Sequence, residues 1–313
     1  MNQDRRLYRA KGDNAHPFGS NIKYLVVLKI NHACNFKCAE CFYGDRGKKS
    51  KVEQARAYTP SPEELAGALG YLAPSIIYLT GGEPLLYKDF LECCVALSRN
   101  HLVGILSNLS IYTELREIVY ALGAKNLFAI GGSVHIAELD RLNKTPEFFR
   151  SLELLLLHGV PCFVIYNMGD KLESYFDWYV KQIGANYGVP IFAKYKQGSG
   201  PINTSVYKTV EAAGVNMSWF TPYDIGRAAI PGMKCGAGVV SLNVDALNGK
   251  IQKCIYDQGN MGNIYTGEFN PAINSFCTEH CYCHTYLFPP GFSDCYDNWA
   301  EFNRLVKPNI AKN

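Results

Sequence analysis

Short apolar runs alternate with longer amphipathic stretches along the first two-thirds of the chain. The runs are mostly apolar over their whole length, which is typical of parallel strands buried on both faces. They cover residues 24–30, 76–79, 102–106, 127–130, 161–166 and 190–194. Helices are predicted between them at about 61–72, 87–99, 113–122, 146–158 and 172–183. The alternation predicts an α/β protein with a parallel sheet and helices outside it.

The pattern changes from about Tyr223 onward. Gly and Asn become frequent, and six of the twelve cysteines fall between residues 235 and 295. Apolar runs flank Asn248-Gly249, a dipeptide that favours the tight turn of a β-hairpin. Such a hairpin would fold Cys235 and Cys254 towards each other. The sequence therefore predicts a small, loop-rich C-terminal domain built on a β-hairpin.

Composition excludes several classes of protein. The 313 residues are 48% apolar and 19% charged, as in an ordinary globular protein. A net charge of +3 without a long basic block gives no reason to expect nucleic acid as a partner. No apolar run reaches the ~18 residues of a membrane span, and residues 1–20 lack the apolar region of a secretory signal. Twelve cysteines in such a chain indicate metal ligands and reduced thiols in a cytoplasmic protein.

Three cysteines stand on the predicted loop after the first strand. Cys34, Cys38 and Cys41 form a C-x3-C-x2-C pattern. Three thiolates can hold three irons of a [4Fe–4S] cluster, which usually takes four cysteine ligands, so that one iron stays open to a small molecule. A zinc knuckle is the alternative, but the next Cys or His along the chain is Cys93, and His32 would complete only a cramped loop.

The spacing of these cysteines resembles that of the radical S-adenosylmethionine (radical SAM) family. In that family the open iron chelates the amino and carboxylate groups of SAM, and a donated electron cleaves SAM to a 5′-deoxyadenosyl radical. The resemblance implies that Cys34, Cys38 and Cys41 are the catalytic cluster ligands. It also implies that the six βα units form a partial (βα)6 TIM-like barrel, and that a flavodoxin- or ferredoxin-type protein donates the electron.

Further motifs follow the predicted strands in the order that this resemblance requires. Gly81, Gly82, Glu83 and Pro84 resemble the family's GGEP motif, which holds the methionyl amine of SAM. Two glycines permit close approach of the backbone to a ligand, and Glu83 supplies charge at the strand end.

Polar residues also follow the third and fourth strands. Ser107, Asn108 and Ser133 stand where the family places contacts to SAM. Helix capping or loop hydrogen bonding would explain Ser107, Asn108 and His135 equally well. The family often has an aromatic residue directly before the third cysteine, where this chain has Glu40, so Phe42 or Tyr43 is the expected adenine contact in its place.

The C-terminal cysteines resemble a SPASM/twitch extension, which binds auxiliary iron–sulfur clusters. Thirteen residues separate Cys235 from Gly249, four separate Gly249 from Cys254, and Gly262-Asn263-Ile264 follows. The resemblance implies one auxiliary [4Fe–4S] cluster, and a structural zinc site is the alternative. Its expected ligands are Cys235, Cys254 and two of Cys277, Cys281, Cys283 and Cys295, with Cys281 and either Cys277 or Cys283 favoured. Core thiols are expected at Cys93, Cys94 and Cys162.

The expected organisation is an N-terminal extension (1–22), a radical SAM core (23–225) and an auxiliary-cluster domain (226–313). The expected reaction is reductive cleavage of SAM followed by hydrogen-atom abstraction from a small molecule or peptide. Because only about twenty residues precede the first strand, no leader-binding domain is expected. A compact core with one auxiliary cluster resembles enzymes that oxidise or epimerise sugars and aminocyclitols in natural-product biosynthesis.

Two alternatives to that substrate class stay open. The first is a peptide (RiPP) maturase that forms a crosslink or thioether without its own leader-binding domain. The second is a non-catalytic iron–sulfur electron carrier, which would need neither a three-cysteine site nor the Gly81–Pro84 motif. Resemblance to the cyclase of the molybdopterin pathway is weaker, because the C-terminal Gly-Gly of that family is absent here and its second cysteine set is spaced differently.

Overall fold

Six parallel strands lie in chain order across one sheet. The computed structural model describes residues 22–38, 41, 59–168, 183, 186–189, 191–195, 237–254 and 259–271. The six strands are β1 (Tyr24–Lys29), β2 (Ser75–Thr80), β3 (Leu102–Ser107), β4 (Leu127–Val134), β5 (Cys162–Met168) and β6 (Ile191–Tyr195). Each pairs in parallel with the next. All six predicted strands and the predicted parallel sheet are therefore confirmed.

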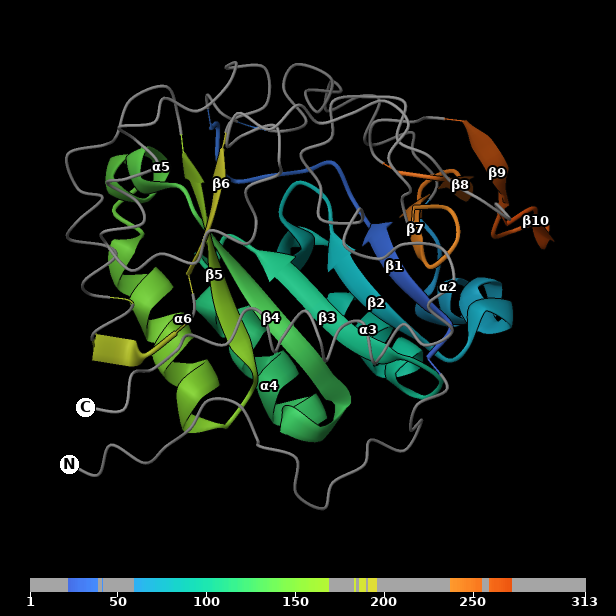
Figure 1. The fold of residues 1–313 in the computed structure, drawn as a ribbon. Coiled ribbons are helices and arrows are strands. Elements are labelled where there is room, and N and C mark those ends of the chain that lie inside the picture. The colour runs from blue at the N-terminus through green and yellow to red at the C-terminus, as the bar shows by residue number, and fades with distance from the viewer. Residues whose placement is uncertain are drawn as a thin grey trace, which may run out of the picture.

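Helices cover one face of this sheet (Figure 1). They are α2 (Pro62–Leu69), α3 (Phe90–Ser98), α4 (Tyr112–Asn126), α5 (Ile136–Arg141) and α6 (Thr145–Leu157). The start of α2 is as predicted, because Ser61 Oγ accepts the Glu64 N–H at 3.2 Å. Helix α5 was not predicted, and the helix predicted at 172–183 lies outside the described residues except for Ile183.

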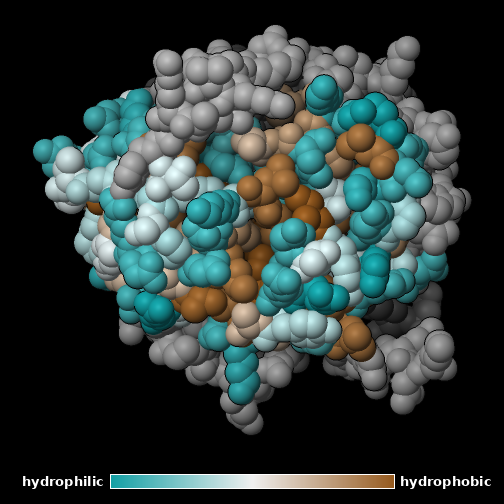
Figure 2. Space-filling model, turned by 180° about the vertical axis from the view of Figure 1, so that it is seen from behind, coloured by the Kyte–Doolittle hydropathy of each residue, from teal (hydrophilic) through white to brown (hydrophobic). Residues whose placement is uncertain are grey.

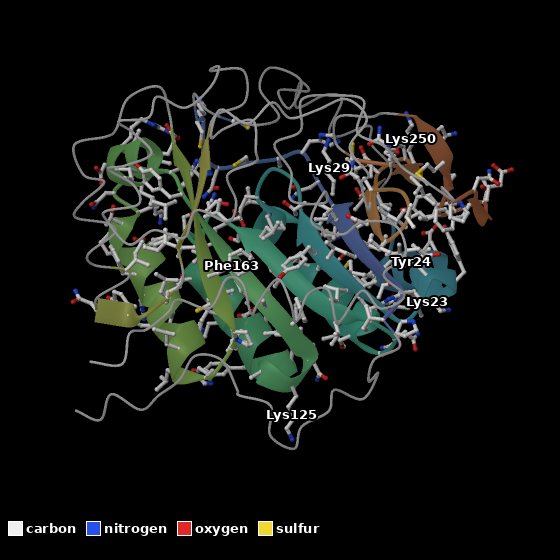
Figure 3. All side chains as sticks on the ribbon, viewed as in Figure 1. Lys23, Tyr24, Lys29, Lys125, Phe163 and Lys250 are labelled. Atoms are coloured by element: carbon white, nitrogen blue, oxygen red, sulfur yellow. The ribbon has the colours of Figure 1, made fainter. Side chains whose placement is uncertain are left out.

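The parallel strands are buried on both faces, as their continuous apolar runs indicate. Val26 and Leu28 of β1 pack with the helices in the main core, whereas Leu25 packs into a smaller cluster on the opposite face. Phe163 of β5 belongs to that second cluster (Figure 3). Two buried faces are what a sheet inside a partial barrel requires.

Figure 2 shows the molecule from behind, so that the helix-covered face points toward the viewer. On this face apolar residues gather along the middle, among polar ones. None of the helices in the described part of the chain is both long and apolar enough to cross a lipid bilayer.

The C-terminal segment extends the same sheet beyond β1. Strand β7 (Ser241–Asp245) pairs in parallel with β1, and β8 (Lys250–Gln252), β9 (Asn260–Asn263) and β10 (Glu268–Phe269) follow it antiparallel. The predicted hairpin is confirmed, with Gly249 in the turn at φ 75°. The hairpin is thus built directly onto the edge of the parallel sheet (Figure 1).

The carboxyl ends of the strands meet at one edge of the sheet. Lys29 at the end of β1 lies opposite Thr80 on β2 and opposite Asp245 on β7. Ser107 at the end of β3 lies opposite Gly132 on β4. The loops that follow β1, β2, β3 and β4 therefore gather at the edge where α/β proteins place their chemistry.

His101, directly before β3, makes the stability of the fold depend on pH. The residue is 1% exposed, and neither ring nitrogen has a hydrogen-bond partner among the described residues. Burial lowers the pKa of His101 to about 4, whereas an unfolded histidine titrates near 6.5. The native state therefore binds fewer protons than the unfolded state between these values, and stability falls as the pH drops from about 6.5 to about 4.

We expect His101→Leu to remove about 3 kcal/mol of this pH dependence over that window. Urea unfolding of both proteins at intervals between pH 4 and pH 7.5 measures it. Because burial also lowers the pKa of His135 to about 4, only the difference between the two curves reports on His101. Parallel curves would contradict the prediction.

Candidate active site at the carboxyl edge of the sheet

The loop after β1 carries Cys34, Cys38 and Cys41 as reduced thiols. Cys34 and Cys41 are exposed, and Cys38 is partly buried. The Phe36 N–H donates to Cys34 Sγ at 3.4 Å, and the Cys41 N–H donates to the Cys38 carbonyl at 3.3 Å. The three thiols thus lie on one tightly turned loop, and the first is already hydrogen-bonded at sulfur as cluster ligands commonly are.

Electrostatics around Cys34 favour the protonated thiol until a cation binds. Desolvation by surrounding protein raises the pKa of the Cys34 thiol to about 11, the Phe36 N–H opposes this, and the Glu83 and Glu138 carboxylates add to it. A metal or cluster must displace that proton, so loading of this site releases protons. By contrast, Cys93, Cys94 and Cys162 are fully buried in the hydrophobic core, as predicted.

Gly81 and Gly82 bring the end of β2 against the cysteine loop. A Cβ atom on Gly81 would lie 2.3 Å from the Asn31 carbonyl oxygen, and one on Gly82 would lie 2.1 Å from the Ala33 carbonyl oxygen. The Gly82 N–H donates to Asn31 O at 3.2 Å, and the Glu83 N–H donates to Ala33 O at 2.7 Å. In this structure, Gly81 and Gly82 therefore permit their own backbone to lie close against the cysteine loop.

Glu83 is fully buried and joins the ends of β2 and β3. Its Oε1 accepts the Ser107 hydroxyl at 2.7 Å and the Leu85 N–H at 3.2 Å, and its Oε2 accepts the Asn108 N–H at 2.8 Å. Burial raises the pKa of Glu83 to about 7, against the lowering effect of these three hydrogen bonds. Pro84 begins a 3-10 turn directly after it, in which Pro84 and Leu85 are buried. The Glu83 side chain thus holds the ends of β2 and β3 together through hydrogen bonds.

A ring of polar side chains ties the cysteine loop to the end of β3. Asn108 Nδ2 donates to Asn35 Oδ1 at 2.8 Å, Asn35 Nδ2 donates to Ser110 Oγ at 2.8 Å, and Ser110 Oγ donates to Asn108 Oδ1 at 2.6 Å. The ring is closed, so the side chain of Asn108 is engaged by the protein. Sequence reasoning missed Asn35 and Ser110, although both flank predicted site residues.

Residues after β4 reach the same loop. Ser133 lies one residue before the end of β4 and is partly buried. The His135 ring meets the Phe36 ring edge to face at 6.2 Å, and burial lowers the pKa of His135 to about 4, so the imidazole is neutral at pH 7. Glu138 of α5 accepts the Lys37 N–H at 2.7 Å. These contacts place the loop across the ends of β2, β3 and β4.

The C-terminal segment also contacts the loop. Asp245 at the end of β7 lies 3.7 Å from His32 Nε2 and 3.9 Å from Lys29 Nζ. Figure 3 shows Lys29 at the end of β1 beside the C-terminal strands. Desolvation opposes ionisation of Asp245, but the His32 hydrogen bond and the Lys29 charge lower its pKa. No sequence pattern signalled this contact, since the two segments are more than two hundred residues apart.

The donor set fits an iron–sulfur cluster with one open iron. Three thiols lie on one accessible loop, and among the described residues no three His, Cys, Asp or Glu side chains converge on a single metal ion. A cubane cluster takes one thiolate at each of three separate iron corners, so such convergence is not required. Cys254 lies just after β8 and is partly buried. The other predicted site residues lie outside the described residues, namely Phe42, Cys235, Cys277, Cys281, Cys283 and Cys295.

Sequence comparison shows what this part of the chain is similar to. The model of the radical SAM superfamily matches residues 28–177. The GTP 3′,8-cyclase of Shewanella denitrificans is 37% identical over 75 residues, which are 24% of this chain and 21% of that protein. The GTP 3′,8-cyclase of Edwardsiella ictaluri is 29% identical over 86 residues, which are 27% of this chain and 26% of that protein. These matches span about a quarter of the relatives' length.

Solved structures show the same fold over most of the chain. Streptococcus suis SuiB bound to precursor peptide SuiA has a TM-score of 0.53 at 14% identity, covering 79% of this chain and 64% of SuiB. The enzyme anSMEcpe with bound AdoMet has a TM-score of 0.52 at 16% identity, covering 78% of this chain and 75% of that chain. The likeness confirms the partial (βα)6 barrel.

Proposed function

We propose that this chain, whose residues 28–177 match the radical SAM superfamily model, is an enzyme that generates a radical from SAM and abstracts a hydrogen atom from a peptide substrate. The observation that carries this proposal is the cysteine loop itself. Its three thiols are held over the ends of β2, β3 and β4 by the Gly81–Pro84 motif, Asn35 and Lys37. A non-catalytic electron carrier needs none of these contacts.

The proposed roles follow the family pattern at matching positions. Cys34, Cys38 and Cys41 hold a [4Fe–4S] cluster, which, when bound, binds SAM at its open iron and supplies the electron that cleaves it. The proposed SAM-binding edge consists of Gly81-Gly82-Glu83-Pro84, Ser107, Asn108 and Ser133. Phe42 or Tyr43 is the proposed adenine contact.

Burial and hydrogen bonding suit these residues to orientation of the ligand. The Glu83 carboxylate and the Asn108 side chain are already held by protein partners. The backbone of the motif is therefore pre-organised before SAM binds, which lowers the cost of orienting it. The second apolar cluster lines the opposite face of the sheet and excludes water below the site.

A peptide is the substrate class that the comparisons favour. SuiB has been solved with precursor peptide SuiA, and anSMEcpe with AdoMet and the Cp18Cys peptide. The same comparisons give no support to the sugar or aminocyclitol expected from the sequence. The cytoplasmic location and the flavodoxin- or ferredoxin-type donor stay predictions.

The test is an anaerobic assay of 5′-deoxyadenosine with reconstituted enzyme, reductant and SAM. Separate reactions contain pooled cysteine-containing peptides, GTP, or a panel of sugars and aminocyclitols. We expect a slow basal rate that rises only with peptide. A rise with GTP or sugar would overturn the peptide assignment, and a complete lack of 5′-deoxyadenosine would overturn the enzyme class.

The C-terminal segment is proposed to hold one auxiliary [4Fe–4S] cluster through Cys235, Cys254 and two of the later cysteines. The hairpin supports this, because β7 and β8 are antiparallel neighbours and a single residue separates Cys254 from the end of β8. We expect Cys254→Ala to lose about four of about eight irons while 5′-deoxyadenosine formation persists. Iron and sulfide counts after reconstitution measure this, and an unchanged iron count would contradict the ligand assignment.

A further inference from the structure

Glu138 makes a contact with the cysteine loop that the family pattern does not assign. Its side chain is 9% exposed and lies on α5, the short helix after β4. Oε2 accepts the Lys37 N–H at 2.7 Å, across 101 residues of sequence. Lys37 directly precedes Cys38, so this hydrogen bond fixes the Phe36–Lys37 peptide unit, one peptide before the one that leads into the second thiol.

Arg141 holds the Glu138 carboxylate in place. Its Nε donates to Oε1 at 2.9 Å and its Nη2 donates to Oε2 at 2.7 Å, a two-pronged charge-assisted pair within one helical turn. The carboxylate therefore has one orientation, and its charge is paired with that of the Arg141 guanidinium. A lone carboxylate at this point would disfavour thiolates.

The anchors of the cysteine loop divide between its two halves. Asn31, Ala33 and Asn35 are tied to β2 and β3 around Cys34. Glu138 ties the loop beyond Phe36, beside Cys38. Loss of that tie leaves a partly buried N–H without its charged acceptor and frees the second half of the loop to move.

We propose that Glu138 is a positioning residue that pre-organises Cys38 for the cluster, through the Lys37 N–H. This inference rests on the proposed function, since it assigns Glu138 to the retention of that cluster. Partners of metal ligands in other proteins set metal affinity by about 10- to 100-fold. We therefore expect Glu138 to control how tightly the site retains iron, more than the chemistry of SAM.

The experiment measures iron release from anaerobically reconstituted full-length protein into a ferrous chelator. Iron of the Cys34/Cys38/Cys41 site is the difference between the wild type and the triple alanine variant. We expect Glu138→Ala to release this iron about 10- to 100-fold faster. Glu138→Gln keeps an oxygen acceptor for the Lys37 N–H and should lie closer to the wild type. The electron paramagnetic resonance signal of the reduced cluster, recorded with and without SAM, gives a second readout.

Glu147→Gln is the matched control. Glu147 pairs with Lys144 at 2.8 Å, also three residues apart, and this pair lies on α6 rather than against the cysteine loop. We expect this variant to release iron at the wild-type rate. Thermal unfolding of each apoprotein shows whether the fold is retained.

Three outcomes are decisive. The inference would be overturned if Glu138→Ala released iron at the wild-type rate. It would also be overturned if Glu147→Gln released iron as fast as Glu138→Ala. Either result would leave the proposed function standing. If the wild type and the triple variant hold the same iron, the proposed function fails first.

Discussion

We expect replacement of Cys38 by alanine to abolish 5′-deoxyadenosine formation while the protein stays folded. Cys38 is partly buried, and its loop is tied to the sheet edge through the Ala33 carbonyl and the Lys37 N–H, so the sheet does not depend on its sulfur. The cluster depends on the Cys38 sulfur, because two thiolates cannot retain a cubane that needs three. The measurement is 5′-deoxyadenosine per enzyme after anaerobic reconstitution, beside circular dichroism of the same sample.

Cys162→Ala is the control for this prediction. Cys162 is 1% exposed at the start of β5, so its loss costs about 1 kcal/mol of stability but leaves SAM cleavage intact. Retained turnover in Cys38→Ala would refute the radical mechanism. Lost turnover in both variants would point to a general effect of cysteine replacement.

Replacement of Glu83 by alanine destabilises the fold as well as the site. The Ser107 hydroxyl and the Leu85 and Asn108 N–H groups lose their acceptor in a fully buried environment. Since each unsatisfied buried donor costs about 1–3 kcal/mol, we expect the free energy of unfolding to fall by about 3–5 kcal/mol. Urea unfolding of the apoprotein measures it. Glu117→Ala, on the exposed face of α4, should change stability by less than about 0.5 kcal/mol.

The effect of Glu83→Ala also has a pH dependence of defined sign. The folded pKa of Glu83 is about 7 because of burial, whereas an unfolded glutamate titrates near 4.3. The native state therefore binds more protons in this window, and the contribution of Glu83 to stability falls as the pH rises through it. The stability difference between wild type and variant should be larger at pH 5 than at pH 8. A difference that grows with pH would show that the three hydrogen bonds outweigh burial.

The strands were predictable because burial on both faces leaves a signal in every residue of a run. Val26, Leu28 and Leu25 are all apolar, although they point to different cores. Helix α5 left no such signal. It has six residues, and His135 at its start makes no capping hydrogen bond with its side chain. Its position is set by tertiary contacts, among them Glu138 with the cysteine loop.

The site was predictable as a set of motifs, but its connections were not. Spacing identified the three cysteines and the Gly81–Pro84 segment, since both are contiguous in sequence. The partners of Asn35 and Lys37 depend on which loop ends share an edge, and thus on the register of β3 and β4. The close approach of Gly82 to Ala33 was not predictable for the same reason, because only the fold brings the Ala33 carbonyl oxygen to where a Cβ of residue 82 would lie.

The pairing of β1 with β7 has a consequence for the order of events during synthesis. Leu25 pairs with Ser241, 216 residues later in the chain. At about 5–20 residues per second, a ribosome adds the second partner about 10–40 seconds after the first. Until then one edge of β1 is unpaired, and His32 lacks its contact with Asp245. The cysteine loop therefore reaches its final setting only after the C-terminal hairpin has been made, so a cluster delivered to the nascent chain would meet a loop supported from one side.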